Sequence, residues 1–311
     1  MNLKVSVIGA GNVGATTAHL IYQSGIADVV LFDIAEGVPQ GKALDLAEAG
    51  PLWKVAASIK GSNNFADTST SDIIVVTAGL PRKPGMSRDD LLHANADVIQ
   101  NVVSNTAPLS PHGIYIVVTN PMDVMTHVAW KVSGFDARRI VGMGGVLDAS
   151  RFRTFLGFEL GVSPEDIETL VLGGHGDLMV PLPRHTTVKG IPVQDLLDQR
   201  RIEALIDRTR TGGAEIVSLL KTGSAYYAPA ASVFQMVKSI LFDEHRVLPC
   251  AVYLSGEYGV HDLFVGVPAI LGKSGVEKII ELKLTDMEKA QVSASADAVR
   301  ELLSMALAPK K

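Results

Sequence analysis

The sequence predicts an α/β fold, with a Rossmann-type doubly wound parallel sheet in its first half and an α+β substrate-binding and catalytic domain in its second. Short, strongly apolar runs alternate with helix-length segments up to about residue 145, and the rhythm then changes. Runs that are apolar nearly throughout indicate strands buried on both faces, as in parallel sheets covered by helices. We therefore expect two domains, at residues 1–145 and 146–311.

Six strands are expected in the first half, at residues 4–8, 29–33, 55–59, 73–77, 114–119 and 140–142. Helix-length segments lie between them, for example at 13–24 and 91–106. This is the inventory of a Rossmann-type dinucleotide-binding domain. In the second half we expect an amphipathic helix at 201–220, strands at 247–254 and 264–271, and a final helix that begins with a capping box at Thr285 and Glu288.

The composition indicates a soluble, folded protein and argues against several classes of partner. The 311 residues are 47% hydrophobic and 20% charged, which argues against disorder. The net charge of −5, without blocks of like charge, argues against nucleic acid or a membrane surface as partner. The single cysteine, Cys250, supports neither an internal disulfide nor a metal site. Without a signal-like start or a long apolar run, we expect a cytoplasmic protein.

A glycine-rich motif lies directly after the first expected strand and at the start of a helix. It consists of Gly9, Ala10, Gly11, Asn12, Val13 and Gly14. In this pattern the first glycine allows a tight turn, the second lets the backbone approach a pyrophosphate, and the third permits close packing of helix and strand. The helix N-terminus would then hold the phosphates of a dinucleotide.

The acid that follows this motif selects the cofactor. Asp33 lies 19 residues after Gly14, at the end of the second expected strand. A carboxylate there accepts hydrogen bonds from both adenine-ribose hydroxyls and repels a 2′-phosphate, so we expect NAD rather than NADP. The alternative is a structural turn with an unrelated aspartate.

Motifs for several other chemistries are absent. The chain lacks the sequence patterns of phosphate-loop NTPases, α/β-hydrolases, zinc proteases of the H-E-x-x-H type and short-chain dehydrogenases. An acid/base group for hydride transfer therefore has to lie elsewhere.

Charged and amide side chains gather just past expected strands four to six: Arg82, Lys83 and Arg88, then Asn120, then Asp148 and Arg151. Ligands of open α/β sheets bind at the carboxyl ends of the strands. In a protein of net charge −5, this concentration of cations predicts a small anionic substrate. Solvated loop charges are the alternative, and we assign Lys83 no role.

A histidine in Gly-Gly-His-Gly-Asp is the candidate general base. His175 follows an apolar run, and its neighbouring glycines leave room for a ligand. Histidine is the natural proton acceptor near neutral pH. Asp148 is a candidate to orient it. Asp148 and Arg151 share one face of a helix, where they form either a surface ion pair or part of a cleft. A structural histidine is the other reading.

These residues resemble a known family. GAGNVG, Asp33, GLPRKPGMSR, VTNP, VLDASRF and GGHGD occur in the order and spacing of the lactate/malate dehydrogenase family, from about residue 3 to 305. EGVPQGKALDL and KTGSAYYAPA are typical of its lactate-dehydrogenase-like branch of bacterial malate dehydrogenases. One departure is Gly144, where the family pattern has alanine.

The resemblance implies roles for the candidate residues. His175 would be the proton acceptor and donor, and Asp148 its orienting partner. Arg151 would bind the C1 carboxylate of the substrate and Arg88 the reacting oxygen.

By the same resemblance, Asn120 would contact substrate and cofactor, while Asn95, Val118 and Thr119 would contact the cofactor. Arg82 would pair with the distal carboxylate of a dicarboxylate, since lactate dehydrogenases of the family carry glutamine at the matching position.

Three functions are compatible with the sequence. The leading one is NAD-dependent oxidation of malate to oxaloacetate, and its nearest rival is oxidation of lactate or another 2-hydroxy acid. The third is a non-catalytic dinucleotide-binding protein, which would not need His175, Asp148 and Arg151. The family comprises dimers and tetramers, so a homo-oligomer is expected.

Overall fold

The computed structural model describes residues 3–80 and 88–308, with the backbone alone at Arg88. Its first half forms a parallel sheet of β1 (Lys4–Ile8), β2 (Asp28–Phe32), β3 (Ile59–Ser62), β4 (Ile73–Val76), β5 (Ile114–Val117) and β6 (Ile140–Gly142). The strand order is β3-β2-β1-β4-β5-β6, all parallel. This doubly wound order confirms the predicted fold class. The strands are added toward one edge of the sheet from β1 to β3 and toward the other edge from β4 to β6, so the topological switch point lies between β1 and β4.

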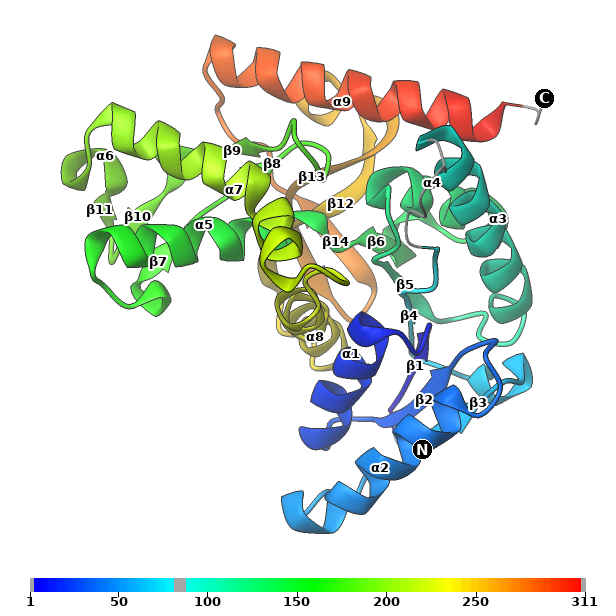
Figure 1. The fold of residues 1–311 in the computed structure, drawn as a ribbon. Coiled ribbons are helices and arrows are strands. Elements are labelled where there is room, and N and C mark those ends of the chain that lie inside the picture. The colour runs from blue at the N-terminus through cyan, green and yellow to red at the C-terminus, as the bar shows by residue number, and fades with distance from the viewer. Residues whose placement is uncertain (1–2, 81–87, 309–311) are drawn as a thin grey trace.

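Helices cover both faces of this sheet. α1 (Asn12–Gln23) and α2 (Val38–Trp53) lie on one side, and α3 (Arg88–Thr106) and α4 (Met122–Ser133) on the other (Figure 1). The central strands are buried because both faces are covered; β4 and β5 have no exposed residue. The predicted helices are confirmed to within three residues at each end.

The prediction of a strand at residues 55–59 is wrong. The third strand is β3, and residue 59 is its first residue. β3 lies at the edge of the sheet, where a continuous apolar run is not required, and its Lys60 is exposed. The apolar Val55, which suggested the earlier start, instead packs partly buried against the core in the connection after α2.

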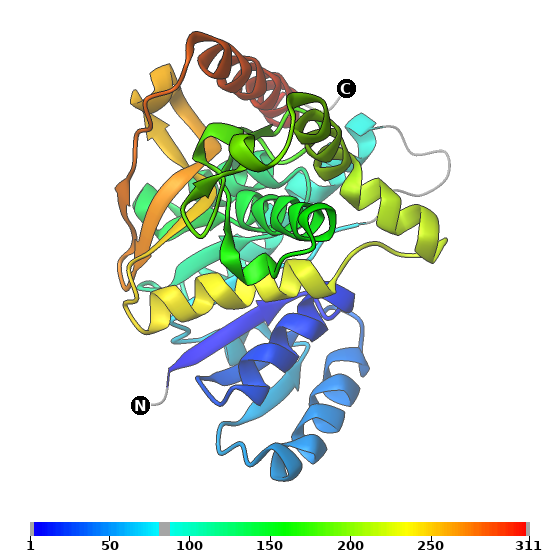
Figure 2. The same cartoon turned by 90° about the vertical axis from the view of Figure 1, so that its left-hand side faces the viewer.

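The second half continues the same sheet. β12 (Arg246–Ser255), β13 (His261–Gly272) and β14 (Gly275–Ile279) are antiparallel, and β12 joins β6 where Ala251 pairs with Gly142. The two predicted C-terminal strands are therefore confirmed as β12 and β13. α8 (Tyr227–Leu241) packs between α1 and α5 (Gly144–Leu160), as Figure 2 shows.

Smaller elements complete this half. β7 (Ile167–Glu168), β10 (Thr187–Val188) and β11 (Ile191–Pro192) form a small sheet, and β8 (Val171–Leu172) pairs with β9 (Val180–Pro181). The short α6 (Val193–Leu196) precedes α7 (Gln199–Leu220). Turns of 3-10 helix lie at Phe65–Thr68, Ala137–Arg139, Pro164–Asp166, Pro183–His185 and Glu257–Gly259. In the described part of the chain, no helix combines the length and apolar content that crossing a bilayer requires.

The last helix, α9 (Asp286–Leu307), is fixed by its first turn. The predicted capping box is present, since the Thr285 hydroxyl accepts the N–H of Glu288 and the Glu288 carboxylate accepts that of Thr285. Arg184 donates to both oxygens of the same buried carboxylate, at 3.0 and 2.9 Å. The hydrogen bonds from Arg184, aided by that from Thr285, outweigh burial and lower the pKa of Glu288 to about 2.

We expect Glu288→Gln to lower the free energy of unfolding by about 1–3 kcal/mol near neutral pH, because charge-assisted hydrogen bonds are lost in a buried setting. A carboxylate whose pKa is depressed on folding stabilises the protein above its unfolded pKa and loses that effect as the pH falls toward its folded pKa. As the pH falls from about 4.5 to 2, the free energy of unfolding should therefore decrease less in the variant than in the wild type.

Urea unfolding at neutral and acidic pH measures this effect. Glu301→Gln, at an exposed position of the same helix, is the matched control. Equal destabilisation by the two substitutions would contradict the assigned role of Glu288.

Candidate active site

Three predicted residues meet at one buried carboxylate. Nδ1 of His175 lies 2.8 Å from Oδ2 of Asp148, and Nη1 of Arg151 lies 3.3 Å from its Oδ1. The side chains of Asp148, Arg151 and His175 are 2, 14 and 17% exposed. Asp148 and Arg151 thus form a largely buried pair on α5 rather than a surface ion pair, and His175 comes to them from the loop after β8.

The environment of His175 favours its protonated form. Burial has the largest single influence and lowers the pKa of the imidazole, but the charge and hydrogen bond of Asp148, together with the charge of Asp123, outweigh it and leave the pKa raised. Because Asp148 faces Nδ1, the proton on that nitrogen is fixed and Nε2 remains for proton exchange.

The loop that carries His175 is tied down by three distant segments. Gly173 exchanges two backbone hydrogen bonds with Gly266 of β13. The N–H of Gly174 donates to Oγ of Ser295 on α9 at 2.9 Å. The N–H of His175 donates to Oδ2 of Asp123 on α4 at 2.7 Å. The backbone of this loop therefore has no freedom to move away from Asp148 without breaking several bonds.

The departure at Gly144 lies directly behind the histidine. A Cβ added to Gly144 would lie 2.6 Å from Cβ of His175, closer than side chains tolerate. Gly144 follows β6, so His175 packs against the carboxyl end of the parallel sheet. The departure consequently concerns the placement of the loop that carries His175 as well as local packing.

The glycine-rich loop has the shape of a phosphate cradle. Gly9 has φ of +109°, and a Cβ at Gly14 would collide with the carbonyl oxygen of Gly9, so both positions require glycine. Gly11 is the N-cap of α1, no side chain caps that helix, and a Cβ at Gly11 would meet nothing within 4 Å. Open space thus faces a helix N-terminus, which fits the pyrophosphate of NAD.

Asp33 lies at the rim of this cradle, directly after β2. Its Oδ2 accepts the N–H of Ala10 at 2.6 Å and its Oδ1 that of Ala35 at 2.9 Å. Lys42 of α2 donates to the carbonyl oxygen of Ala10 at 2.6 Å, so it also holds the glycine-rich loop in place. No spacing rule in the sequence pointed to Lys42.

The predicted cofactor contacts after β4 and β5 are joined to one another. The Asn95 amide accepts the N–H of Leu80 at 2.7 Å and donates to the carbonyl of Asn120 at 2.8 Å. Thr119 donates to the carbonyl of Ala78 at 2.7 Å, and the preceding Val118 is partly buried. Asn95 therefore bridges the two loops. Asn120 is exposed beyond the carboxyl end of β5.

Arg82 lies outside the described residues, and for Arg88 the structure gives only a backbone position at the start of α3. Their predicted contacts with substrate are therefore not visible in the geometry.

Arg151 has a guanidinium nitrogen that remains to be paired. Its Nε is buried and has no hydrogen-bond partner among the described residues. Gly212 and Gly213 of α7 face it, since Cβ atoms there would lie 3.4 Å from its Cδ and 3.5 Å from its Nη2. α7 runs through these glycines without interruption, so they mark a close approach of two helices rather than a break. The 14% of the Arg151 side chain that remains exposed can pair with an anionic ligand.

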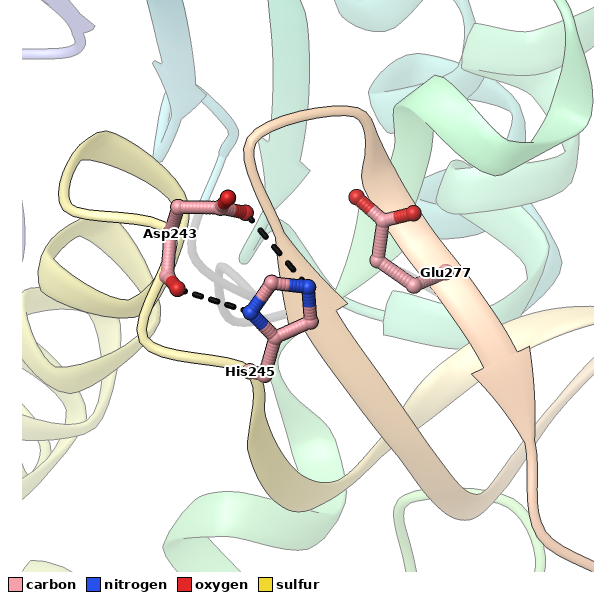
Figure 3. Close-up of side chains that lie close together, drawn as sticks. All are labelled: Asp243, His245 and Glu277. Carbon is pink, nitrogen blue, oxygen red and sulfur yellow. Dashed lines mark hydrogen bonds and ion pairs between the residues drawn. The ribbon is translucent and has the colours of Figure 1, made fainter.

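One further group of titratable side chains lies away from this site. Asp243, His245 and Glu277 are the one set among the described residues with the spacing of metal ligands (Figure 3). The two carboxylates already accept the N–H groups of Lys273 and Ser274, at 2.8 and 3.1 Å, and Lys273 Nζ lies 3.8 Å from Asp243. These contacts are those of a capped turn between β13 and β14, and we assign the group a structural role.

Comparison with known proteins agrees with this geometry. The lactate/malate dehydrogenase NAD binding domain matches residues 3–142, and the lactate/malate dehydrogenase alpha/beta C-terminal domain matches residues 145–308. The malate dehydrogenase of Thermomicrobium roseum is 59% identical over 303 residues, which cover 97% of this chain and 98% of that one.

Solved structures give the same result. The malate dehydrogenase of Salinibacter ruber is 49% identical, with a TM-score of 0.94 and 97% of each chain covered. The lactate dehydrogenase of Cryptosporidium parvum, in complex with lactic acid and NAD, is 40% identical, with a TM-score of 0.95 and 99% of each chain covered. The chain therefore belongs to the lactate/malate dehydrogenase family, and its N-terminal half is the NAD-binding domain of that family.

Proposed function

We propose that this protein is an NAD-dependent malate dehydrogenase, which interconverts (S)-malate and oxaloacetate with His175 as the acid and base. The observation that carries this proposal is the buried set of His175, Asp148 and Arg151 at the carboxyl end of a sheet whose glycine-rich loop fits NAD. The relatives named malate dehydrogenase favour malate over the lactate alternative.

In the oxidative direction, Nε2 of His175 accepts the hydroxyl proton of the substrate. Asp148 keeps the proton on Nδ1 and stabilises the imidazolium that forms, without becoming protonated itself. NAD, when bound, accepts the hydride that leaves the substrate carbon. In the reductive direction the imidazolium returns its proton to the carbonyl oxygen.

Two arginines and an asparagine hold the substrate for this transfer. Arg151 binds the C1 carboxylate, and Asp148 fixes its guanidinium through Nη1. Arg88, at the start of α3, polarises the reacting oxygen, and Asn120 lies between substrate and cofactor.

We also propose a domain division, an oligomeric state and a location for this protein. Residues 1–145 form the NAD-binding domain, and residues 146–311 form the substrate-binding and catalytic domain, which supplies Arg151 and His175. This division falls in the first turn of α5. A homo-oligomer is supported by an open cavity of about 660 Å³ between α5 and α8, whose lining includes the exposed Tyr227 and Val247. Residues 146, 149, 150 and 153 of α5 line that cavity, on the face opposite Asp148. We propose a cytoplasmic location.

The choice of substrate tests the function directly. The distal carboxylate of oxaloacetate needs a cation once water is excluded, and Arg82 supplies it in this proposal. With pyruvate, which has a methyl group there, Arg82 would be left unpaired. We expect kcat/KM to favour oxaloacetate strongly, and Arg82→Gln to reduce kcat/KM for oxaloacetate by about 30- to 5,000-fold, equivalent to about 2–5 kcal/mol.

NADH oxidation with each substrate measures the ratio, and Lys83→Gln is a neighbouring control that removes the same charge. A wild type that prefers pyruvate would overturn the proposed function. An oxaloacetate/pyruvate ratio that Arg82→Gln changes no more than Lys83→Gln would overturn the role of Arg82.

The cofactor preference should depend on Asp33. Asp33→Ser removes the ribose acceptor and the charge that repels a 2′-phosphate, so we expect weaker NADH binding and a rise of about tenfold or more in the NADPH/NADH ratio of kcat/KM. Asp45→Ser, an exposed acid on α2, is the control for loss of charge in the same domain. Use of NADPH as well as NADH by the wild type would contradict this assignment.

A further inference from the structure

A second buried carboxylate, that of Asp123, contacts the loop that carries His175. Asp123 lies in the first turn of α4 and is 4% exposed. Its Oδ2 accepts the main-chain N–H of His175 at 2.7 Å, and its Oδ1 is buried without a hydrogen-bond partner in the described part of the chain. A buried carboxylate is costly unless its charge is compensated, so its presence beside a functional histidine requires an explanation.

The charges around His175 come from two helices. Among the described residues, Asp148 and Arg151 of α5 and Asp123 of α4 are the charged groups that act on it. α9, the third neighbour of this loop, contributes the uncharged Ser295 and Val299 around Gly174. Arg151 opposes protonation of the imidazole, while the two carboxylates favour it.

The surroundings of Asp123 raise the pKa of its carboxylate toward neutral pH. Burial, reinforced by the neighbouring charge of Asp148, raises its pKa to about 6, although the hydrogen bond and charge of His175 oppose this rise. Above this pKa the carboxylate is an anion.

We propose that Asp123 is a positioning residue of the dehydrogenase reaction: its carboxylate fixes the backbone of His175 and its charge, added to that of Asp148, stabilises the protonated imidazole. This inference rests on the proposed function. Asp148 holds the ring of His175 and Asp123 holds its main chain, so the two carboxylates fix the histidine from both ends.

The charge of Asp123 gives this role a signature in the pH dependence. A nearby carboxylate favours the imidazolium, so its removal lowers the pKa of His175. Malate oxidation needs the unprotonated imidazole, and the acidic limb of its pH profile then moves to lower pH. Oxaloacetate reduction needs the imidazolium, so its alkaline limb moves in the same direction and its rate near pH 8 falls.

Asp123→Asn tests the proposal because the amide keeps a hydrogen-bond acceptor and nearly the same volume while losing the charge. Ser295→Ala is the matched control, since it removes a neutral acceptor from the adjacent N–H of the same loop. Should Asp123→Asn fail to fold, Asp123→Ser carries the same expectation, because its hydroxyl is a smaller neutral acceptor.

Two readouts are needed. The first is an NMR titration of histidine-labelled protein without substrate, in which the His175 signal is identified by its absence from His175→Asn. The second is kcat/KM against pH in both directions. We expect the pKa of His175 to fall by about 0.5–1.5 units in Asp123→Asn, with a loss of about 3- to 30-fold in reduction near pH 8. In Ser295→Ala the pKa should stay within about 0.2 units of the wild type.

A His175 pKa that Asp123→Asn leaves unchanged, or that Ser295→Ala lowers equally, overturns the proposal. The NMR titration does not depend on the substrate. A wild type that fails to oxidise malate therefore contradicts the proposed function without deciding the role of Asp123, which the titration decides by itself.

Discussion

The carboxylate of Asp148 is shared between His175, the proposed proton carrier, and Arg151, the proposed substrate-binding arginine. One oxygen accepts from His175 and the other from Arg151, and the group is 2% exposed. Leaving either oxygen of a buried carboxylate unpaired is costly, so the position of each partner is constrained by the other. Proton acceptor and anion-binding group are consequently held at a fixed separation before any ligand arrives, which is what orientation in catalysis requires.

The fold delivers the partners of Asp148 from distant parts of the chain. The parallel sheet places the loops after β1, β4, β5 and β6 at one edge, which brings the glycine-rich loop, Asn120 and α5 to the same side. β12 and β13 then extend the sheet, and Gly266 of β13 anchors the loop that carries His175. α9, fixed by the capping box and Arg184, supplies Ser295 to the same loop. The sheet and α9 together hold the loop that carries His175 in place.

Much of this arrangement could be predicted from the sequence, because the signals were local. The buried strands are apolar runs, the cradle is a six-residue motif, and Asp148 and Arg151 are three residues apart. The chemistry of a histidine–aspartate pair suggested that Asp148 orients His175, and the family resemblance added the role of Arg151. Asp123, Ser295 and Lys42 were not predicted, since their partners lie 52, 121 and 32 residues away and no spacing rule joins them. The one misplaced strand, β3, is at the edge of the sheet, where its polar Lys60 weakens the apolar signal.

The claim that Asp148 organises the site is tested most directly by the turnover of Asp148→Asn. The amide preserves size and burial but removes the charge that selects the Nδ1 proton and stabilises the imidazolium. We predict that kcat for malate oxidation falls by about 10²–10⁴-fold, while the Kd for NADH, measured by fluorescence titration, stays within about threefold of the wild type. Turnover within about threefold of the wild type, at unchanged NADH affinity, would contradict the account.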